Sequence, residues 1–231
     1  MSETRRQTRA DKGSIRLNRR DLFALEWIYD MVAIFESDIP HLLDPRKPIT
    51  RNAVRAIVRR WESAGVVHAE HALTYQGRLV HLTRAGTRLV LRADLDTAPA
   101  VDASAVEIIH QALVARARLR IEERGVAGAP VQGWMSARRW RVENTLQVEY
   151  NVLDPDGLVC LEDGTVAVVQ LCHTVVEIQR LQPFLAGLSV QYPVVLLAIP
   201  QDLRARAENV LFHARAAHWD RADEALQIVT L

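Results

Sequence analysis

One stretch of the chain carries arginine and asparagine side chains at the spacing of a single helical face. In PITRNAVRAIVRRWESAG, residues 48–65, an α-helix places Arg51, Asn52, Arg55 and Arg59 on one arc that contains no acid. Arginine can bond guanine with two N–H groups, asparagine can bond adenine, and further arginines can hold phosphates. These side chains are therefore candidates for contacts in the major groove of DNA. The alternative is a solvated basic face on an ordinary surface helix.

The ends and the other side of this segment favour a helix that packs on a core. Thr50 can accept a hydrogen bond from a free amide of the first turn, and Gly65 can end the helix in a left-handed conformation. Thr50 is counted with the candidate DNA-binding residues because it begins the basic face. The apolar residues follow the spacing i, i+3, i+4, i+7 and are Val54, Ile57, Val58 and Trp61.

The elements around this helix give it a defined context. A long amphipathic helix is expected from Asn18 or Asp21 to Phe35, and a shorter one from Ser37 to Leu43. The segment DPRKP then breaks the chain before the basic helix. After that helix, residues 66–73 and 78–82 read as the strands of a β-hairpin, and a further helix opens at Thr83.

The order of these elements resembles the winged helix-turn-helix family over residues 18–95. The resemblance is carried by the basic third helix, the hairpin ESAGVVHAEHALTYQGRLVHL and the LTRAG segment that follows it. It implies that the third helix enters the major groove of double-stranded DNA and that Tyr75, Gln76 and Arg78 of the hairpin contact the adjacent backbone. Some winged domains bind protein instead.

The N-terminal residues form a basic segment with almost no apolar content. Residues 1–20 contain seven Lys or Arg against two acids, although the whole chain has a net charge of only +1. We expect residues 1–17 to be a flexible arm in which Arg5, Arg6 and Arg9 reach a minor groove or phosphates. A tail that only improves solubility is the alternative.

The composition excludes several classes of protein. The chain has no apolar run of the roughly 18 residues that span a bilayer, and its N-terminus lacks the apolar segment of a signal peptide, so we expect a cytoplasmic protein without a membrane partner. Cys160 and Cys172 both lie in apolar, strand-like sequence and are expected to be buried thiols. The eight histidines show no metal-ligand spacing, so no cofactor is expected.

The second half of the chain alternates between helix and strand. Ser104 is expected to cap a helix that ends at Gly125, with His110 as a core histidine on its apolar side. A short helix from Trp134, a strand at residues 146–153, a hairpin around Asp163-Gly164 and a strand at residues 193–199 are expected to follow. The last elements are helices at residues 174–187 and 202–218 and a strand at residues 225–231. The expected class is α+β, with a layered α/β domain at the C-terminus.

This second half resembles the restriction-endonuclease-like core, and the whole chain resembles the bacterial replication-relaxation family of plasmid and mobile-element proteins. The likeness covers most of residues 18–190. It is carried by the segment IIHQALVAR, the pattern W-x-S-x-R-x-x-R, the PDG turn and the strand AVVQL, and the residues of the pattern and the turn are Trp134, Ser136, Arg138, Arg141 and Pro155 to Gly157.

A nuclease of the PD-(D/E)xK type needs one Asp, a second acid and a Lys to hold Mg²⁺ and activate water. Asp156 occupies the first position, but Val168, Val169 and Gln170 stand where the second acid and the Lys are expected, and Ala137 stands where a Glu is expected. Asp156 is therefore interpreted as an ordinary turn residue. Glu177 is the one candidate for a displaced acid.

The sequence thus predicts four parts: a basic arm (1–17), a winged helix-turn-helix domain (18–96), a connecting helix (97–126) and a nuclease-like α/β domain without catalysis (127–231). The expected function is sequence-specific binding of double-stranded DNA, as a transcriptional regulator or an accessory factor in replication or transfer of a mobile element. A homodimer is expected, because paired half-sites double the base contacts. The alternatives are a PD-(D/E)xK-type nuclease with a relocated acid cluster and a protein–protein adaptor.

Overall fold

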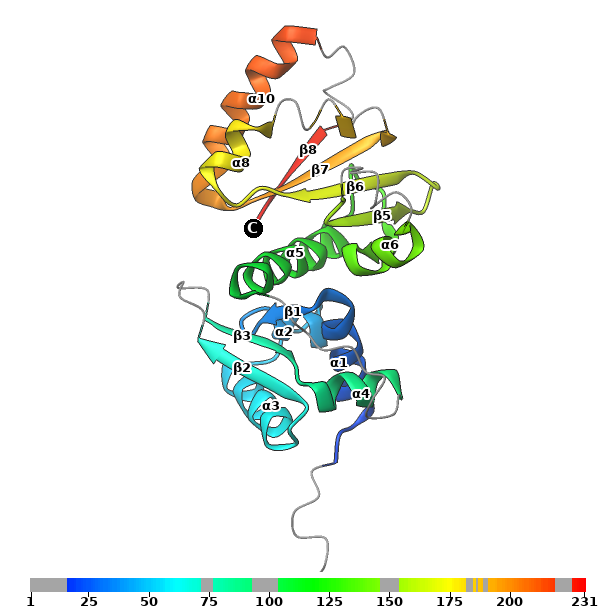
Figure 1. Cartoon of the computed structure of the whole chain (residues 1–231), viewed down its shortest axis with the longest axis vertical. Coiled ribbons are helices and arrows are strands. Elements are labelled where there is room, and N and C mark those ends of the chain that lie inside the picture. Colours follow the sequence, from blue (N-terminus) through cyan, green and yellow to red (C-terminus); the bar gives the residue numbers. More distant parts are fainter. Residues whose placement is uncertain are drawn as a thin grey trace, which may run out of the picture.

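The computed structural model of the chain describes residues 16–71, 77–92, 104–145, 154–181, 185, 187–188, 191–218 and 226–231. The fold is α+β, as expected. N-terminal helices pack with a small antiparallel sheet, and a mixed five-stranded sheet forms the C-terminal half (Figure 1). Within the described residues, no helix combines the length and the apolar character that crossing a membrane requires.

The described residues of the N-terminal half form four helices and three strands. Its elements are α1 (Arg19–Met31), β1 (Ala33–Phe35), α2 (Ile39–Leu43), α3 (Arg51–Ser63), β2 (Val67–His71), β3 (Arg78–Leu82) and α4 (Arg84–Leu91). The strand order is β1-β3-β2, and both pairings are antiparallel. The hairpin expected after the basic helix is thus β2–β3, and its turn at residues 72–76 lies outside the described residues.

Two of the expected helices are shorter than the sequence suggested. The first ends at Met31 rather than Phe35, because Val32 has a positive φ of 68° and Ala33–Phe35 pairs with β3 as a fully buried strand. The helical spacing of these apolar residues was therefore misleading. The second helix begins at Ile39 rather than at Ser37. Ser37 does not cap it, since Asp38 is the N-cap residue.

Close packing between elements explains the glycines in two of the quoted motifs. A Cβ on Gly86, in the LTRAG segment, would lie 1.9 Å from the carbonyl oxygen of Val66. A Cβ on Gly157, in the PDG turn, would lie 2.4 Å from Cζ2 of Trp134. Both glycines are therefore required by contacts between elements.

The C-terminal half begins with the long helix α5. The elements are α5 (Ala105–Arg124), β4 (Val131–Ser136), α6 (Ala137–Glu143), β5 (Gly157–Leu161), β6 (Val166–Leu171), α8 (Val175–Gln179), β7 (Val194–Ile199), the 3₁₀ turn η1 (Gln201–Leu203), α10 (Arg204–His218) and β8 (Leu226–Thr230). The strand order is β4-β5-β6-β7-β8, in which the first two pairings are antiparallel and the last two are parallel.

Two expected elements in this half differ from the structure. The helix expected at residues 174–187 is interrupted, since α8 ends at Gln179. The short helix begins at Ala137, not at Trp134, because Trp134 pairs with Val159 in β4 and Ser136 caps the helix that follows. The strand expected at residues 146–153 lies outside the described residues. The hairpin at Asp163-Gly164 and the buried strand before Pro200 are confirmed as β5–β6 and β7.

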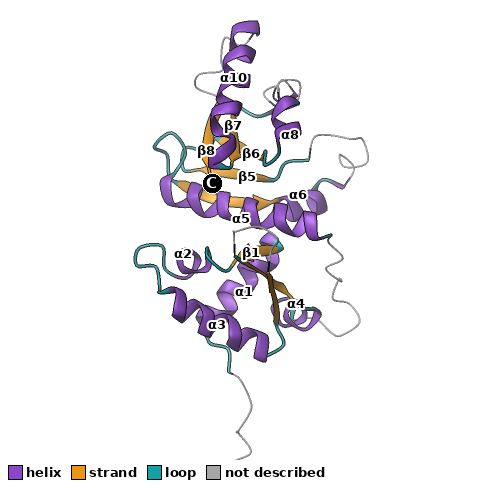
Figure 2. Ribbon diagram, turned by 90° about the vertical axis from the view of Figure 1, so that its left-hand side faces the viewer, coloured by secondary structure: helices purple, strands orange, loops and turns teal. Residues whose placement is uncertain are grey.

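Helix α5 lies between the two halves and contributes to a core that both share (Figure 1). Its buried residues include Ala112, Val114 and Ala117, and it contacts β1 on one side and the five-stranded sheet on the other. Helices α8 and α10 cover the opposite face of that sheet (Figure 2). A strand covered on both faces is apolar at every position, as β7 is.

Polar side chains also connect the halves, and several come from the W-x-S-x-R-x-x-R pattern. Asp30 of α1 accepts hydrogen bonds from Ser136 Oγ at 2.7 Å and from Arg118 Nη1 at 2.9 Å. The guanidinium of Arg138 stacks 4.1 Å from the ring centroid of Tyr29. The pattern therefore attaches the C-terminal half to the first helix.

Candidate nucleic-acid interface

Helix α3 has the two faces that the sequence indicated. Arg51, Asn52, Arg55 and Arg59 are all exposed. Within the described part of the chain, none of the three arginines forms an ion pair. The apolar stripe is buried, with at most 6% exposure, and consists of Val54, Ile57, Val58 and Trp61. Thr50 caps the helix, since its Oγ1 accepts a hydrogen bond from the Ala53 amide.

A buried carboxylate fixes α3 against α1. Asp21, which is 1% exposed, accepts hydrogen bonds from Trp61 Nε1 at 3.0 Å and from Asn18 N, and it forms an ion pair with Arg60. The charge of Arg60 is thus paired with a buried carboxylate of the protein itself. This contact lies in the C-terminal half of α3 and leaves the N-terminal turns, where Arg51 is found, facing solvent.

Arg78 has a different environment from the one implied by the resemblance. Its guanidinium donates to both carboxylate oxygens of Glu36, at 2.7 and 3.2 Å, and lies 3.4 Å from Glu62 of α3. The hydrogen bond to Glu36 is the main reason that the pKa of Arg78 is raised. Arg78 therefore joins β3 to α3 and is not available as a free cation for phosphate.

Five of the predicted residues lie outside the described part of the chain, and two exposed basic residues near α3 were not predicted. Tyr75, Gln76 and the arm residues Arg5, Arg6 and Arg9 lie outside the described residues. Arg46 and Lys47 are exposed in the loop that leads into α3. The sequence contained this signal in the segment DPRKP, which we interpreted only as a break between helices.

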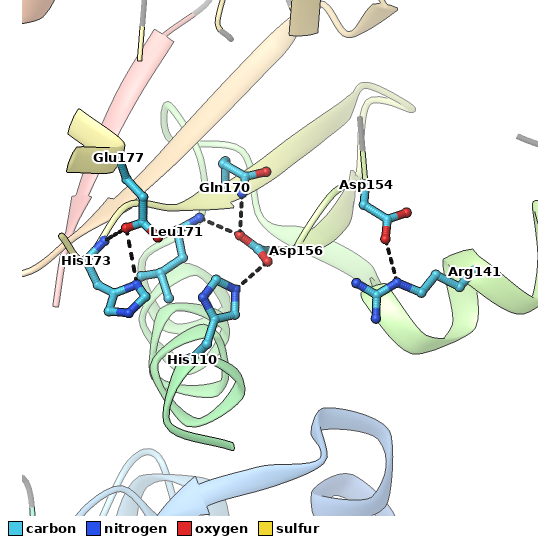
Figure 3. Close-up of polar contacts among 8 residues, drawn as sticks. All are labelled: His110, Arg141, Asp154, Asp156, Gln170, Leu171, His173 and Glu177. Carbon is cyan, nitrogen blue, oxygen red and sulfur yellow. Dashed lines mark hydrogen bonds and ion pairs between the residues drawn. The ribbon is translucent and has the colours of Figure 1, made fainter. Parts of the chain in front are cut away.

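Asp156, for which the resemblance implied the position of a nuclease carboxylate, lies at the centre of a hydrogen-bond network (Figure 3). It is 8% exposed and accepts from Leu171 N at 2.7 Å and from Gln170 Nε2 at 2.8 Å. Its other oxygen lies 2.6 Å from His110 Nε2. The interpretation of Asp156 as an ordinary turn residue was therefore incomplete, because the carboxylate joins β5, β6 and α5.

His110, expected to be a core histidine, is partly buried and pairs with the carboxylate of Asp156. Burial alone would lower the pKa of His110, but its hydrogen bond to Asp156 and the negative charge of that carboxylate outweigh burial, so the pKa is raised. The imidazolium form is thus stabilised by its partner. Gln170, where a nuclease would carry an acid, donates to Asp156 instead of adding a second carboxylate.

Glu177, the candidate displaced acid, forms hydrogen bonds to the backbone at the start of its own helix. Its Oε2 accepts from the amides of His173 and Thr174, at 2.8 and 2.9 Å, and completes the capping box of α8. No cluster of three or more His, Cys, Asp or Glu side chains suited to a metal ion occurs among the residues that the structure describes.

Comparison of this chain with protein-family models, with curated proteins and with solved structures gives no match.

Proposed function

We propose that the protein binds double-stranded DNA in a sequence-specific manner through α3 and carries out no catalysis. The observation that carries the proposal is the exposed, unpaired basic face of α3, set against an apolar stripe that is buried. Arg51, Asn52 and Arg55 supply the hydrogen-bond donors that base edges accept, and Arg59 with Arg46 and Lys47 supplies charge for phosphates.

The arrangement of elements supports a winged helix-turn-helix reading of the N-terminal half. Helix α3 follows α2 through a short loop, and the β2–β3 hairpin follows α3. With the resemblance of the whole chain to the replication-relaxation family, this favours a transcriptional regulator or an accessory factor in replication or transfer of a mobile element. The absence of catalysis is proposed because Asp156 and Glu177 are occupied by internal contacts.

The test compares two double variants that remove the same charge. In Arg51→Ala/Arg55→Ala the removed side chains lie on α3, whereas in Arg139→Ala/Arg141→Ala they are exposed on α6. A duplex is first selected from a random library with the wild-type protein, and its affinity is then measured by fluorescence anisotropy. Each lost contact is worth about 1–3 kcal/mol, so the α3 variant should bind at least about tenfold more weakly.

The same titrations at several salt concentrations report how many DNA phosphates the protein contacts. The logarithm of the association constant should fall by about 0.9 per phosphate contact for each tenfold rise in salt. The α6 variant should retain wild-type affinity and slope. Equal affinities of the two variants would refute α3 as the DNA-binding element and favour an adaptor, and Mg²⁺-dependent cleavage of plasmid would refute the proposal of no catalysis.

We also propose that the protein binds as a homodimer, because one helix reads few base pairs and a symmetric pair doubles them. Light scattering at micromolar concentration, with and without the selected duplex, measures the mass directly. A monomeric mass in both samples would contradict this part of the proposal.

A further inference from the structure

A cleft with a volume of about 320 Å³ lies between α2 and the last turns of α5. Asp38, His41 and Pro45 line one side, and the α5 side includes Arg116 and Arg120. This volume is at the lower end of the range of small-molecule sites, about 300–1,000 Å³. The cleft is separate from the exposed face of α3.

Three arginines of α5 line this cleft at intervals of four residues. Residues at i and i+4 are neighbours on one helical face, so Arg116, Arg120 and Arg124 form a row along about 12 Å of helix. Like charges at this spacing repel one another. Unless other charges compensate it, the row has a positive potential that favours an anion.

The compensation inside the protein is incomplete. Arg116 donates to Asp38 Oδ2 at 2.8 Å, but Arg120 Nη1 donates to the carbonyl oxygen of Thr230, which carries no net charge. In the described part of the chain, the side chains of Arg124 and His41 have neither a hydrogen bond nor an ion pair.

The two acids of α5 at the cleft offset the charge of the row only in part. Glu122 accepts from Arg118 Nε at 2.7 Å, so its carboxylate is directed at an arginine outside the row, one that also pairs with Asp30. Glu123 is exposed. It is the one lining carboxylate that forms no ion pair among the described residues, and it should therefore oppose the binding of an anion.

Burial adds to the electrostatic imbalance. Burial, followed by the charges of Arg116 and Arg124, lowers the pKa of Arg120. Burial also raises the pKa of Asp38 although Arg116 lies beside it. An anion that reached Arg120 and Arg124 would relieve the repulsion between them, and it would do so where water is partly excluded and charges interact more strongly.

We propose that this cleft is a binding site for a small phosphate-bearing molecule, held by Arg120 and Arg124 with His41 on the opposite wall. The planar guanidinium matches phosphate oxygens with two parallel N–H donors. Two arginines one helical turn apart suit a diphosphate better than a single phosphate. Leu119 on the α5 side and Pro45 on the other side offer apolar contacts to the organic part of the ligand.

The experiment is a calorimetric titration of the full chain with sodium pyrophosphate. Three single variants are compared: Arg124→Gln, Glu123→Gln and, as a control for charge outside the cleft, Arg139→Gln of α6. All three side chains are exposed, so each variant should fold, and its melting temperature checks this.

Saturable binding is expected for the wild type. Arg124→Gln should weaken it about tenfold, because a charge-assisted hydrogen bond is lost, whereas Glu123→Gln should strengthen it about two- to threefold. Arg139→Gln should bind as the wild type does.

Absence of saturable binding would overturn the proposal, as would equal affinities of Arg124→Gln and Arg139→Gln. If Arg124→Gln lost affinity for the duplex while no variant bound pyrophosphate, the proposal would also be overturned. The cleft would then contact a phosphate of DNA rather than a small molecule. The proposal does not depend on the DNA-binding role of α3.

Discussion

Replacing Asp156 with alanine tests whether this carboxylate is a structural group or the remnant of a catalytic one. The substitution removes three hydrogen bonds, from Leu171 N, Gln170 Nε2 and His110 Nε2. Because the carboxylate is 8% exposed, water cannot readily replace it. The Leu171 amide and the imidazole would be left without their acceptor.

The size of the effect follows from these contacts. A hydrogen bond to a charged group contributes about 1.5–3 kcal/mol, but such contributions are not additive within one network. Breaking a buried charged pair typically costs about 3–5 kcal/mol. We therefore expect Asp156→Ala to lower the free energy of unfolding by about 3–5 kcal/mol, a large part of the roughly 5–15 kcal/mol available to a folded protein.

Asp154→Ala is the matched control. Asp154 lies two residues earlier and pairs with Arg141 at 2.6 Å, but both side chains are at least 35% exposed (Figure 3). An exposed pair contributes only about 0–1 kcal/mol. Urea unfolding followed by tryptophan fluorescence measures both variants. If Asp156→Ala is no more destabilising than Asp154→Ala, the network does not support the fold and the structural interpretation fails.

Three further predictions concern single side chains. Burial raises the pKa of Cys172 to about 12, so a thiol reagent should modify only Cys160 in the folded protein, and a Cys160→Ser variant that still reacts quickly would contradict this. The pKa of His110 is raised on folding, so its contribution to stability is complete below the unfolded value of 6.5 and is lost as pH rises through the folded pKa. The destabilisation of His110→Asn, measured by urea unfolding, should thus be larger at about pH 5.5 than at about pH 8.5, and the reverse order would refute the assignment. Val58→Asp places a charge at a fully buried position and should abolish the cooperative thermal transition, whereas Ala56→Asp, on the exposed side, should retain it.

Helices whose ends carry capping residues could be predicted from the sequence. Thr50, Thr83 and Ser104 each cap the helix that was expected to follow, through a hydrogen bond from the third residue of the helix. Gly65 has a φ of +69°, as the end of α3 required. These signals are local, since a hydroxyl, an amide three residues later and a left-handed turn do not depend on distant parts of the chain.

Tertiary contacts explain where the sequence interpretation was wrong. Ala33–Phe35 continues the apolar spacing of the first helix, but pairing with β3 and cover from α5 make it a strand. Asp156 looked like a turn residue because its partners lie 14 to 46 positions away in sequence. Periodicity reports which faces are apolar and does not report which distant element will cover them.

The pairing of arginines across the protein bears on the choice between a functional and a merely solvated face on α3. Several arginines that are partly removed from water meet an acid, as Arg60 meets Asp21, Arg78 meets Glu36 and Arg118 meets Asp30. Desolvated charge is costly without a partner, so folding itself accounts for these pairs.

No such requirement applies to Arg51, Arg55 and Arg59, which remain in water. A face that was merely solvated would gain a few tenths of a kcal/mol from acids at i+4 and would commonly contain them. The only acid of α3 is Glu62, and it lies beside Arg78. The absence of a carboxylate on the basic arc leaves its charge available to an external polyanion, and this is why we prefer DNA binding to the solvated-face alternative.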